Sequence, residues 1–186
     1  VGQFCFCRDV TIERTFEHQI WISANTDALT GLYNRRFFYE YMNENRKENQ
    51  LSLLYVDLDD FKKVNDAHGH HIGDGALELV ARLMREAFPG DFIVRLGGDE
   101  FLICLVGERS LAFLEEKANR LLQSLLEAFQ VSDYLRVMSA SIGIASSADP
   151  GTKLDDLVRQ SDIAMYAAKQ SGKSRCCVYS PGLIKK

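Results

Sequence analysis

The sequence predicts an α+β domain in which a central antiparallel sheet is flanked by helices. From residue 51 onward, apolar runs and amphipathic patterns follow one another in the order β-α-β-β-α-β. The run 51–58 is almost continuously apolar, which favours a strand buried on both faces near the centre of the sheet. Two short runs, 92–96 and 101–106, enclose a Gly-Gly-Asp-Glu turn and predict a hairpin. Together these observations indicate a ferredoxin-like βαββαβ core.

A linker helix is expected ahead of this core, over residues 12–26. Ile12, Phe16, Ile20 and Ser23 recur there at steps of four and three residues, which makes a seam one or two heptads long. Such a seam suits pairing with a second copy of the chain. Packing of the helix on its own domain is the alternative.

The same two periods predict the remaining elements. Helices are expected at 36–48, 61–67, 74–88, 111–129 and 154–170, and further strands at 1–7, 137–145 and 176–179. The segment 69–74 between two of the helices is expected to be a loop, with Asp74 as the N-cap of the helix that follows.

Composition and charge exclude several classes of function. The 186 residues carry a net charge of −4 and are 46% hydrophobic, which predicts a globular domain without a general nucleic-acid-binding surface. No run approaches the ~18 apolar residues of a membrane span, and no signal peptide is recognised. A cytoplasmic location is therefore predicted, with membrane attachment of a longer parent protein left open. The five cysteines include no Cys-x-x-Cys pair, so a zinc site is set aside.

Acidic side chains follow the central strand and also occupy the hairpin turn. Asp57 lies at the end of the apolar run, and Asp99 and Glu100 lie in the turn. The predicted fold places these positions side by side, where three carboxylates without a cationic partner would be unstable. Such oxygen ligands suit Mg²⁺, and two such ions about 3.5–4 Å apart are a recurrent device for in-line displacement at phosphorus. The residues alone therefore indicate nucleotidyl transfer, and an ordinary hairpin with a solvated turn is the alternative.

Over about 27–179 the chain resembles the diguanylate cyclases of the GGDEF family. Six motifs in order carry the resemblance: Asp27-x-Leu29-Thr30-Gly31-Leu32-x-Asn34-Arg35-Arg36, Asp57-x-Asp59-x-Phe61-Lys62-x-x-Asn65-Asp66, Gly69-His70-x-x-Gly73-Asp74, Gly97-Gly98-Asp99-Glu100-Phe101, Ser141-Ile142-Gly143 and Ala164-x-Tyr166-x-Ala168-Lys169. The resemblance implies a nucleotidyl-cyclase, palm-like core. It also implies that two GTP molecules are joined into cyclic di-GMP, a bacterial second messenger, with release of two pyrophosphates. Two Mg²⁺ ions per active site, replaceable by Mn²⁺, and a homodimer with apposed sites are part of the same expectation.

The resemblance also implies roles for the matching residues. The metal ligands would be Asp57, Leu58 through its carbonyl, Asp99 and Glu100. Asp99, supported by Glu100, would accept the proton of the ribose 3′-hydroxyl that attacks the α-phosphate in line. The guanine edge would be held by Asn65 and Asp74 with His70 close by, and the phosphates by Gly98, Lys62, Lys169, Lys173 and the backbone N–H groups of Asp60 and Phe61. A solvated Lys62 and a His70 that only shapes its loop are the plainer alternatives for those two residues.

Two departures from the family pattern bear on function. Lys173 stands where many relatives have arginine, so a point charge replaces a planar fork. Many relatives also carry an inhibitory product site, Arg-x-x-Asp, just upstream of the hairpin. Here the run is Phe88-Pro89-Gly90-Asp91, so only the aspartate remains and bidentate arginine contact is lost. Weak or absent product inhibition through this site is predicted.

Four segments are expected along the chain. Residues 1–11 resemble the end of an upstream PAS-like sensor domain, 12–26 a signalling and dimerisation helix, 27–180 the GGDEF catalytic domain, and 181–186 a tail or linker.

An active cyclase is the first interpretation because Asp57 and the hairpin residues Gly97, Gly98, Asp99 and Glu100 are all present. The alternative is a silent module that binds GTP or cyclic di-GMP and regulates an adjacent phosphodiesterase or output domain. A nucleic-acid polymerase is excluded, since the chain lacks a basic surface and the length for template-holding domains.

Overall fold

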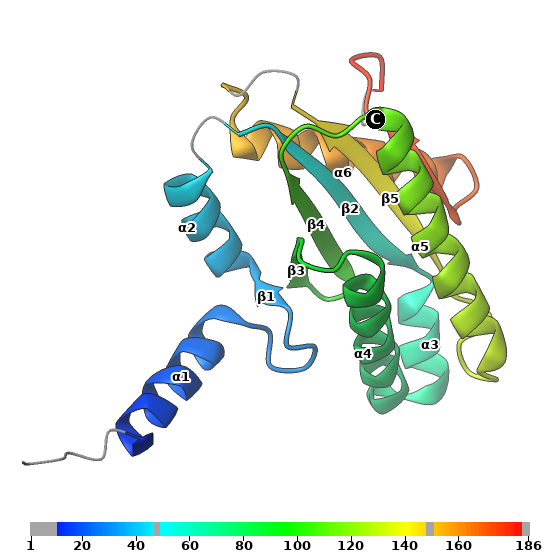
Figure 1. Cartoon of the computed structure of the whole chain (residues 1–186). Helices are drawn as coiled ribbons and strands as arrows, with labels where there is room; N and C mark the ends of the chain where they lie inside the picture. Colours follow the sequence, from blue (N-terminus) through cyan, green and yellow to red (C-terminus); the bar gives the residue numbers. More distant parts are fainter. Residues whose placement is uncertain (1–10, 47–48, 148–150, 184–186) are drawn as a thin grey trace, which may run out of the picture.

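The computed structural model describes residues 11–46, 49–147 and 151–183 and has an α+β fold built on a mixed six-stranded sheet (Figure 1). The strands are β1 (Tyr33–Asn34), β2 (Leu51–Asp59), β3 (Phe92–Gly97), β4 (Glu100–Val106), β5 (Ser139–Ser146) and β6 (Arg175–Val178). The helices are α1 (Thr11–Asn25), α2 (Arg35–Asn45), α3 (Phe61–His68), α4 (His70–Ala87), α5 (Leu111–Val131) and α6 (Leu154–Gln170). The expected strand at 1–7 and nearly all of the expected sensor-domain end lie outside the described residues.

The strands lie in the sheet in the order β1-β3-β4-β2-β5-β6. β2 pairs antiparallel with β4 and β5, and β3 pairs antiparallel with β4. The pairs β1–β3 and β5–β6 at the two edges are parallel. The α+β class, the βαββαβ order and the antiparallel centre are thus confirmed, while the parallel edge pairs make the whole sheet mixed.

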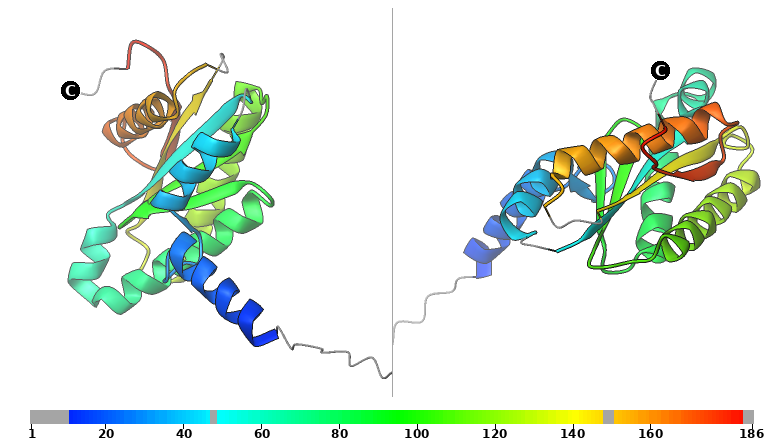
Figure 2. Two further views of the ribbon diagram at one scale, coloured as in Figure 1. Left: turned by 90° about the vertical axis from the view of Figure 1, so that its left-hand side faces the viewer. Right: turned by 90° about the horizontal axis from the view of Figure 1, so that it is seen from above.

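Alternation along β2 sends its side chains into two separate hydrophobic cores. Leu54, Val56 and Leu58 pack in the core that α4 and α5 cover. Leu53 and Tyr55 pack in the core that α2 and α6 cover. Figure 2 shows α6 on one side of the sheet and α5 on the other. The same alternation directs the side chains of Asp57 and Asp59, at the end of β2, toward the face that α6 covers.

The start of α4 differs from the expectation. The segment 69–74 is not a loop, because α4 begins at His70, directly after Gly69 with its positive φ of 87°. Asp74 therefore lies inside the helix and is not its N-cap. The sequence is misleading because two glycines, Gly73 and Gly75, stand within the first turns. Gly73 is needed there for packing, since it is buried against the side chain of Asn65 in α3.

Smaller differences concern the ends of other elements. α5 runs two residues further than the expected 111–129, and β5 begins two residues later than the expected 137–145. The two-residue β1 was not predicted, because it lies in a turn-rich stretch with no periodic pattern. Its residue Asn34 also caps α2, since its side chain accepts a hydrogen bond from the Phe37 N–H.

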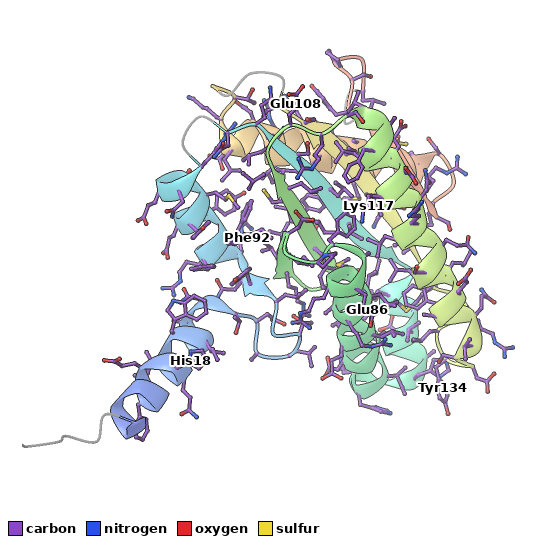
Figure 3. The ribbon with its side chains drawn as sticks, in the orientation of Figure 1. His18, Glu86, Phe92, Glu108, Lys117 and Tyr134 are labelled. Atoms are coloured by element: carbon purple, nitrogen blue, oxygen red, sulfur yellow. The ribbon has the colours of Figure 1, made fainter. Side chains whose placement is uncertain are left out.

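The helix α1 leaves the body of the domain and contacts it through few residues (Figure 1). Trp21 packs edge-on against Phe37 of α2, with ring centroids 5.4 Å apart. Phe37 in turn neighbours Tyr33 and Phe92, the first residue of β3, which is labelled on the side toward α2 in Figure 3. Phe16 and Ile20 of α1 remain exposed. Within the described ranges, none of the helices has the length and apolar character needed to span a bilayer.

Candidate active site

The acidic end of β2 lies directly beside the hairpin turn between β3 and β4. Asp57 is the cross-strand partner of Glu100, and the Leu58 N–H donates a hydrogen bond of 3.2 Å to the carbonyl of Asp99. The turn requires its glycines, since Gly98 has a φ of +52° and Gly97 a φ of +152°. The structure therefore brings together the two acidic segments that the topology was expected to juxtapose.

A lysine from α6 meets this acidic pair. The Lys169 ammonium lies 2.5 Å from Oδ1 of Asp57 in an ion pair, and Asp57 is only 8% exposed. Burial raises the pKa of Asp57 to about 6; Lys169 opposes the rise, and the nearby carboxylates of Asp99 and Glu100 add to it. Glu100 also faces Tyr55, whose pKa is raised by burial and by the Glu100 carboxylate, so the phenol stays protonated. The ion pair was not expected, because Lys169 was assigned to phosphate.

Asp59 has a structural part that the sequence reasoning missed. Its carboxylate is 1% exposed and accepts hydrogen bonds from Ser139 Oγ at 2.7 Å and from Ser141 Oγ at 2.9 Å. The Ser174 N–H, in the turn after α6, donates a further bond of 3.2 Å. Asp59 therefore fastens the end of β2 to β5 and to that turn. Serines at alternate positions of a strand were the available signal, but their partner lies some 80 residues away in sequence.

Two strained turns face each other beside this network. Asp60, Lys173 and Ser174 all adopt left-handed backbone conformations, with φ values of 61°, 60° and 49°. Each such residue costs about 1–3 kcal/mol, and such strain clusters at functional sites. The Asp60 carboxylate joins the turns, since it pairs with Lys63 at 2.8 Å and with Lys173 at 2.9 Å. These two lysines hold the pKa of Asp60 below its usual value, with Lys63 the larger cause.

The candidate guanine residues lie at the start of α4 and on α3. Asn65 packs against Gly73, and a Cβ added to Gly73 would stand 2.0 Å from Asn65 Oδ1. That oxygen is buried and has no hydrogen-bond partner among the described residues, which marks a place where a donor is missing. Asp74 follows Gly73 directly in α4 and is exposed.

The other candidate ligands are spread over the surroundings. His70 and Lys62 are exposed, on the first turns of α4 and α3. Phe61 is 9% exposed, and its side chain belongs to the hydrophobic core, which leaves only its backbone for a ligand. Lys173 is held beside the end of β2 by its ion pair with Asp60. The structure thus gathers the metal candidates with Lys169 and Lys173 around the end of β2, and leaves His70 and Lys62 without a described contact to them.

Arg95 is a second residue that the sequence reasoning did not assign. Its Nε and Nη2 donate to the Gly98 carbonyl at 3.0 and 2.8 Å, and its Nη1 donates to Asp27 Oδ1 at 3.0 Å. Burial acts to raise the pKa of Asp27, but hydrogen bonds from Thr30 and Arg95 bring it below the usual value. One guanidinium therefore ties the hairpin turn to the loop that follows α1.

The upstream inhibitory position is degenerate in space as well as in sequence. Phe88 is 1% exposed and belongs to the core, so no arginine stands there. Burial raises the pKa of the half-buried Asp91, while Arg109 and Lys117 oppose the rise. Asp91 borders a hollow of about 290 Å³ that also contacts Trp21 and Arg85. The Arg85 guanidinium donates to the Thr30 carbonyl at 2.7 Å.

The donor set fits a hard divalent cation in its chemistry. Asp57 and Glu100 offer carboxylate oxygens on one face of the sheet, as Mg²⁺ prefers. Asp57 Oδ1 is buried, and its described partner is a cation, the Lys169 ammonium at 2.5 Å, so this oxygen already attracts positive charge. The described residues nevertheless contain no group of three or more His, Cys, Asp or Glu side chains already gathered around a metal position. The coordination shell of a metal ion here would consist of the two carboxylates together with oxygen atoms from water or phosphate.

Comparison with known proteins decides the family. The family model described as "Diguanylate cyclase, GGDEF domain" matches residues 24–175. The chain belongs to the GGDEF family. This GGDEF domain is 38% identical over 181 residues to "Cyclic di-GMP phosphodiesterase PdeR" of Escherichia coli, with 95% of this chain and 27% of that protein covered. It is 34% identical over 196 residues to "Probable diguanylate cyclase DgcE" of Escherichia coli, with 97% of this chain and 17% of that protein covered.

The GGDEF domain is also similar to solved structures. The coiled coil and GGDEF domain of DgcB from Caulobacter crescentus, in complex with c-di-GMP, superposes with a TM-score of 0.80 at 28% identity. The match covers 90% of this chain and 93% of that one. The matched part of the chain covers about a quarter or less of the length of these two relatives, which extend well beyond it.

Proposed function

We propose that this GGDEF domain is a diguanylate cyclase, which condenses two GTP molecules into cyclic di-GMP with release of two pyrophosphates. One observation carries the proposal. Asp57 stands in register with Glu100, and the Leu58 N–H is bonded to the Asp99 carbonyl, so the acidic strand end and the intact Gly-Gly-Asp-Glu turn form one site. Membership of a family whose model is described as a diguanylate cyclase supports the same reaction.

In this proposal the acidic residues act on the attacking hydroxyl. Asp99 accepts the proton of the ribose 3′-hydroxyl, and Glu100 supports the carboxylate cluster. Asp57, the Leu58 carbonyl, Asp99 and Glu100 would hold Mg²⁺ or Mn²⁺, which when bound lowers the pKa of the hydroxyl and neutralises charge on the phosphates. The buried, carboxylate-rich end of β2 supports this assignment, because such a cluster needs a cation.

The remaining candidates orient the nucleotide. Asn65 and Asp74 hold the guanine edge, and a carboxylate there can accept from guanine N1–H and N2–H₂. Lys173 and the N–H groups at the start of α3, from Asp60 and Phe61, hold the phosphates, since a helix N-terminus favours anions. His70, Lys62 and Gly98 stay in the proposal as residues at the rim of the pocket. The turns fixed by Asp59 and Asp60 support a phosphate pocket that is formed before the ligand arrives.

The product requires two nucleotides that face each other, so the active form is proposed to be a homodimer. The exposed Phe16 and Ile20 of α1 support this, because an apolar helix face left in solvent is typical of an interface. A segment resembling a PAS sensor upstream, and control of the dimer through α1, belong to the same proposal. Turnover by a species that is monomeric in analytical ultracentrifugation under assay conditions would contradict it.

The decisive experiment incubates the purified chain with GTP and Mg²⁺ and separates the nucleotides by chromatography. Cyclic di-GMP is the expected product, and the double variant Asp99→Ala, Glu100→Ala should bind GTP but form none. Because the isolated chain needs to pair, the assay is repeated with the chain fused to a dimeric coiled coil. GTP binding without product in the fused form would rule out the cyclase.

The second candidate is a regulatory module without turnover, which binds GTP or cyclic di-GMP and controls an adjacent phosphodiesterase domain. It is favoured by the names of two relatives, "Cyclic di-GMP phosphodiesterase PdeR" and "Cyclic di-GMP phosphodiesterase PdeB" of Shewanella oneidensis. This chain covers 27% and 21% of those proteins. Saturable GTP binding in the fused form, with no product, is the result that would select this candidate.

A further inference from the structure

The carboxylates at the end of β2 are neutralised in different ways. Asp59 is satisfied by two serine hydroxyls and the backbone N–H of Ser174. Asp57 is nearly as buried, yet among the described residues its one salt bridge is with Lys169. A buried carboxylate needs such a partner, because its charge is costly to remove from water. Lys169 is therefore the counter-ion of the Asp57 carboxylate in this structure.

A divalent cation on Asp57 and the ammonium of Lys169 cannot share this position. The ammonium lies 2.5 Å from Oδ1, only slightly further than the about 2.0–2.1 Å at which Mg²⁺ contacts an oxygen ligand, so both cations would occupy the same place on that oxygen. Two cations on one oxygen in a partly buried place would repel each other strongly. We propose that Lys169 is the exchangeable counter-ion of the candidate metal site: it holds Asp57 while the site is empty and moves onto the nucleotide phosphates when a divalent cation binds. The proposal rests on the proposed function, because it takes Asp57 as a metal ligand.

The position of Lys169 allows this movement. It is the penultimate residue of α6, its side chain is 29% exposed, and a lysine stem has four rotatable carbons. Lys173 lies four residues further on and is held differently. Its backbone is left-handed, and its ammonium is bound to Asp60, which is also held by Lys63. Of these two lysines, Lys173 marks the phosphate end of the site, and Lys169 can reach either that end or Asp57.

The exchange couples the two ligands of the site. A metal ion that binds alone displaces the ammonium into solvent, where it has no new anion to meet. A metal ion that binds with a nucleoside triphosphate displaces it onto phosphate oxygens. The metal should therefore bind more tightly in the presence of the nucleotide, and by linkage the nucleotide should gain by the same factor from the metal. Part of this coupling arises because phosphates themselves coordinate metals, so the share due to Lys169 is the part that its removal abolishes.

The test measures binding of Mn²⁺ alone to the 186-residue chain at pH 8, from the free Mn²⁺ signal in electron paramagnetic resonance. Lys169→Met keeps the apolar stem and removes the charge, and Lys153→Met is the matched control, because Lys153 is an exposed lysine at the opposite end of α6. Without nucleotide, Lys169→Met should bind Mn²⁺ about 5-fold or more tightly than the wild type, which is the lower end of usual coupling factors. Lys153→Met should match the wild type. With a GTP analogue that cannot be cleaved at the α-phosphate, the gain in Mn²⁺ affinity should be smaller for Lys169→Met than for the wild type.

Equal or weaker binding of Mn²⁺ alone by Lys169→Met would overturn the exchange, and so would an unchanged gain from the nucleotide. Near-ultraviolet circular dichroism checks that each variant is folded, and Lys169→Gln takes the place of the methionine variant if that one is not. Asp57→Asn separates this proposal from the proposed function. If Asp57→Asn loses Mn²⁺ binding and Lys169→Met leaves it unchanged, only the exchange fails. If Asp57→Asn binds Mn²⁺ as the wild type does, the metal site itself fails and the exchange with it.

Discussion

Replacing Gly73 by alanine tests whether Asn65 holds the guanine base. The added methyl carbon would stand 2.0 Å from Asn65 Oδ1, 2.9 Å from its Cγ and 3.2 Å from its Nδ2. Carbon and oxygen do not approach so closely, so the amide of Asn65 must rotate or withdraw. The obstacle is the end of a flexible side chain, so the helix itself can stay in place. The substitution therefore displaces one proposed ligand without removing it.

The size of the effect follows from the bonds at stake. If the amide of Asn65 makes two hydrogen bonds to guanine, each contributing about 1 kcal/mol net, their loss weakens GTP binding about 30-fold, since 1.4 kcal/mol is tenfold. The free energy of unfolding should change little. Alanine in place of glycine inside a helix stabilises by up to about 1 kcal/mol, and this gain offsets the repacking of Asn65.

The assay is GTP binding by isothermal titration calorimetry, with urea unfolding of the same samples. Gly75→Ala is the control, because it makes the same change two residues along α4, where an added Cβ meets nothing within 4 Å. It should keep the wild-type affinity. In an Asn65→Ala background, Gly73→Ala should have no further effect on affinity. Wild-type affinity in a folded Gly73→Ala variant, or the same loss in the Asn65→Ala background, would refute the reasoning.

Four further predictions concern stability, pH, the hairpin and inhibition. Gly143→Ala should lower the free energy of unfolding in urea by about 3 kcal/mol or prevent folding, because its Cβ would lie 2.0–2.1 Å from backbone atoms of α6; wild-type stability would contradict this. Mn²⁺ affinity should be constant above pH 7 and fall as pH drops below about 6, since protons compete for the Asp57 carboxylate, whose pKa is about 6; a flat profile from pH 7 to 5 would count against it. Arg95→Lys should cost about 1–2 kcal/mol in urea unfolding, because a lysine cannot keep the paired bonds to the Gly98 carbonyl, and an unchanged midpoint would argue otherwise. Cyclic di-GMP should inhibit the chain weakly, and Asp91→Ala should leave that inhibition unchanged; micromolar inhibition that disappears in this variant would reverse the conclusion.

The periodicity of apolar residues was sufficient to predict the elements whose burial is regular. The continuous apolar run of β2 indicated a central strand, and the alternation in β5 separated Ile142 and Ile144, which face α4 and α5, from Gly143, which faces α6. The meeting of Asp57 with the hairpin could also be predicted, because the βαββαβ order leaves few ways to arrange the strands. Both results depend on pattern and topology, which are local or nearly local properties of the sequence.

The remaining features depend on contacts between distant residues. The predicted start of α4 was wrong because glycines are typical of loops. Gly73 is instead needed inside the helix, where it lets α4 pack on Asn65. Asp59 lies 80 residues or more from its partners in sequence, and Asp57 is comparably far from Lys169, so no spacing rule connects them. The role of Arg95 was missed for the same reason. Side-chain pairing of this kind becomes visible only when the backbone brings the residues together.

The guanidinium of Arg95 has a mechanical consequence. It is bonded at one end to Asp27, the second residue after α1, and at the other end to the Gly98 carbonyl in the turn that bears Asp99. A sideways displacement of that loop must either pull the carbonyl with it or break a charge-assisted bond. A twist of α1 relative to the domain would therefore act on the geometry of the turn through a single side chain, with no rearrangement of the sheet.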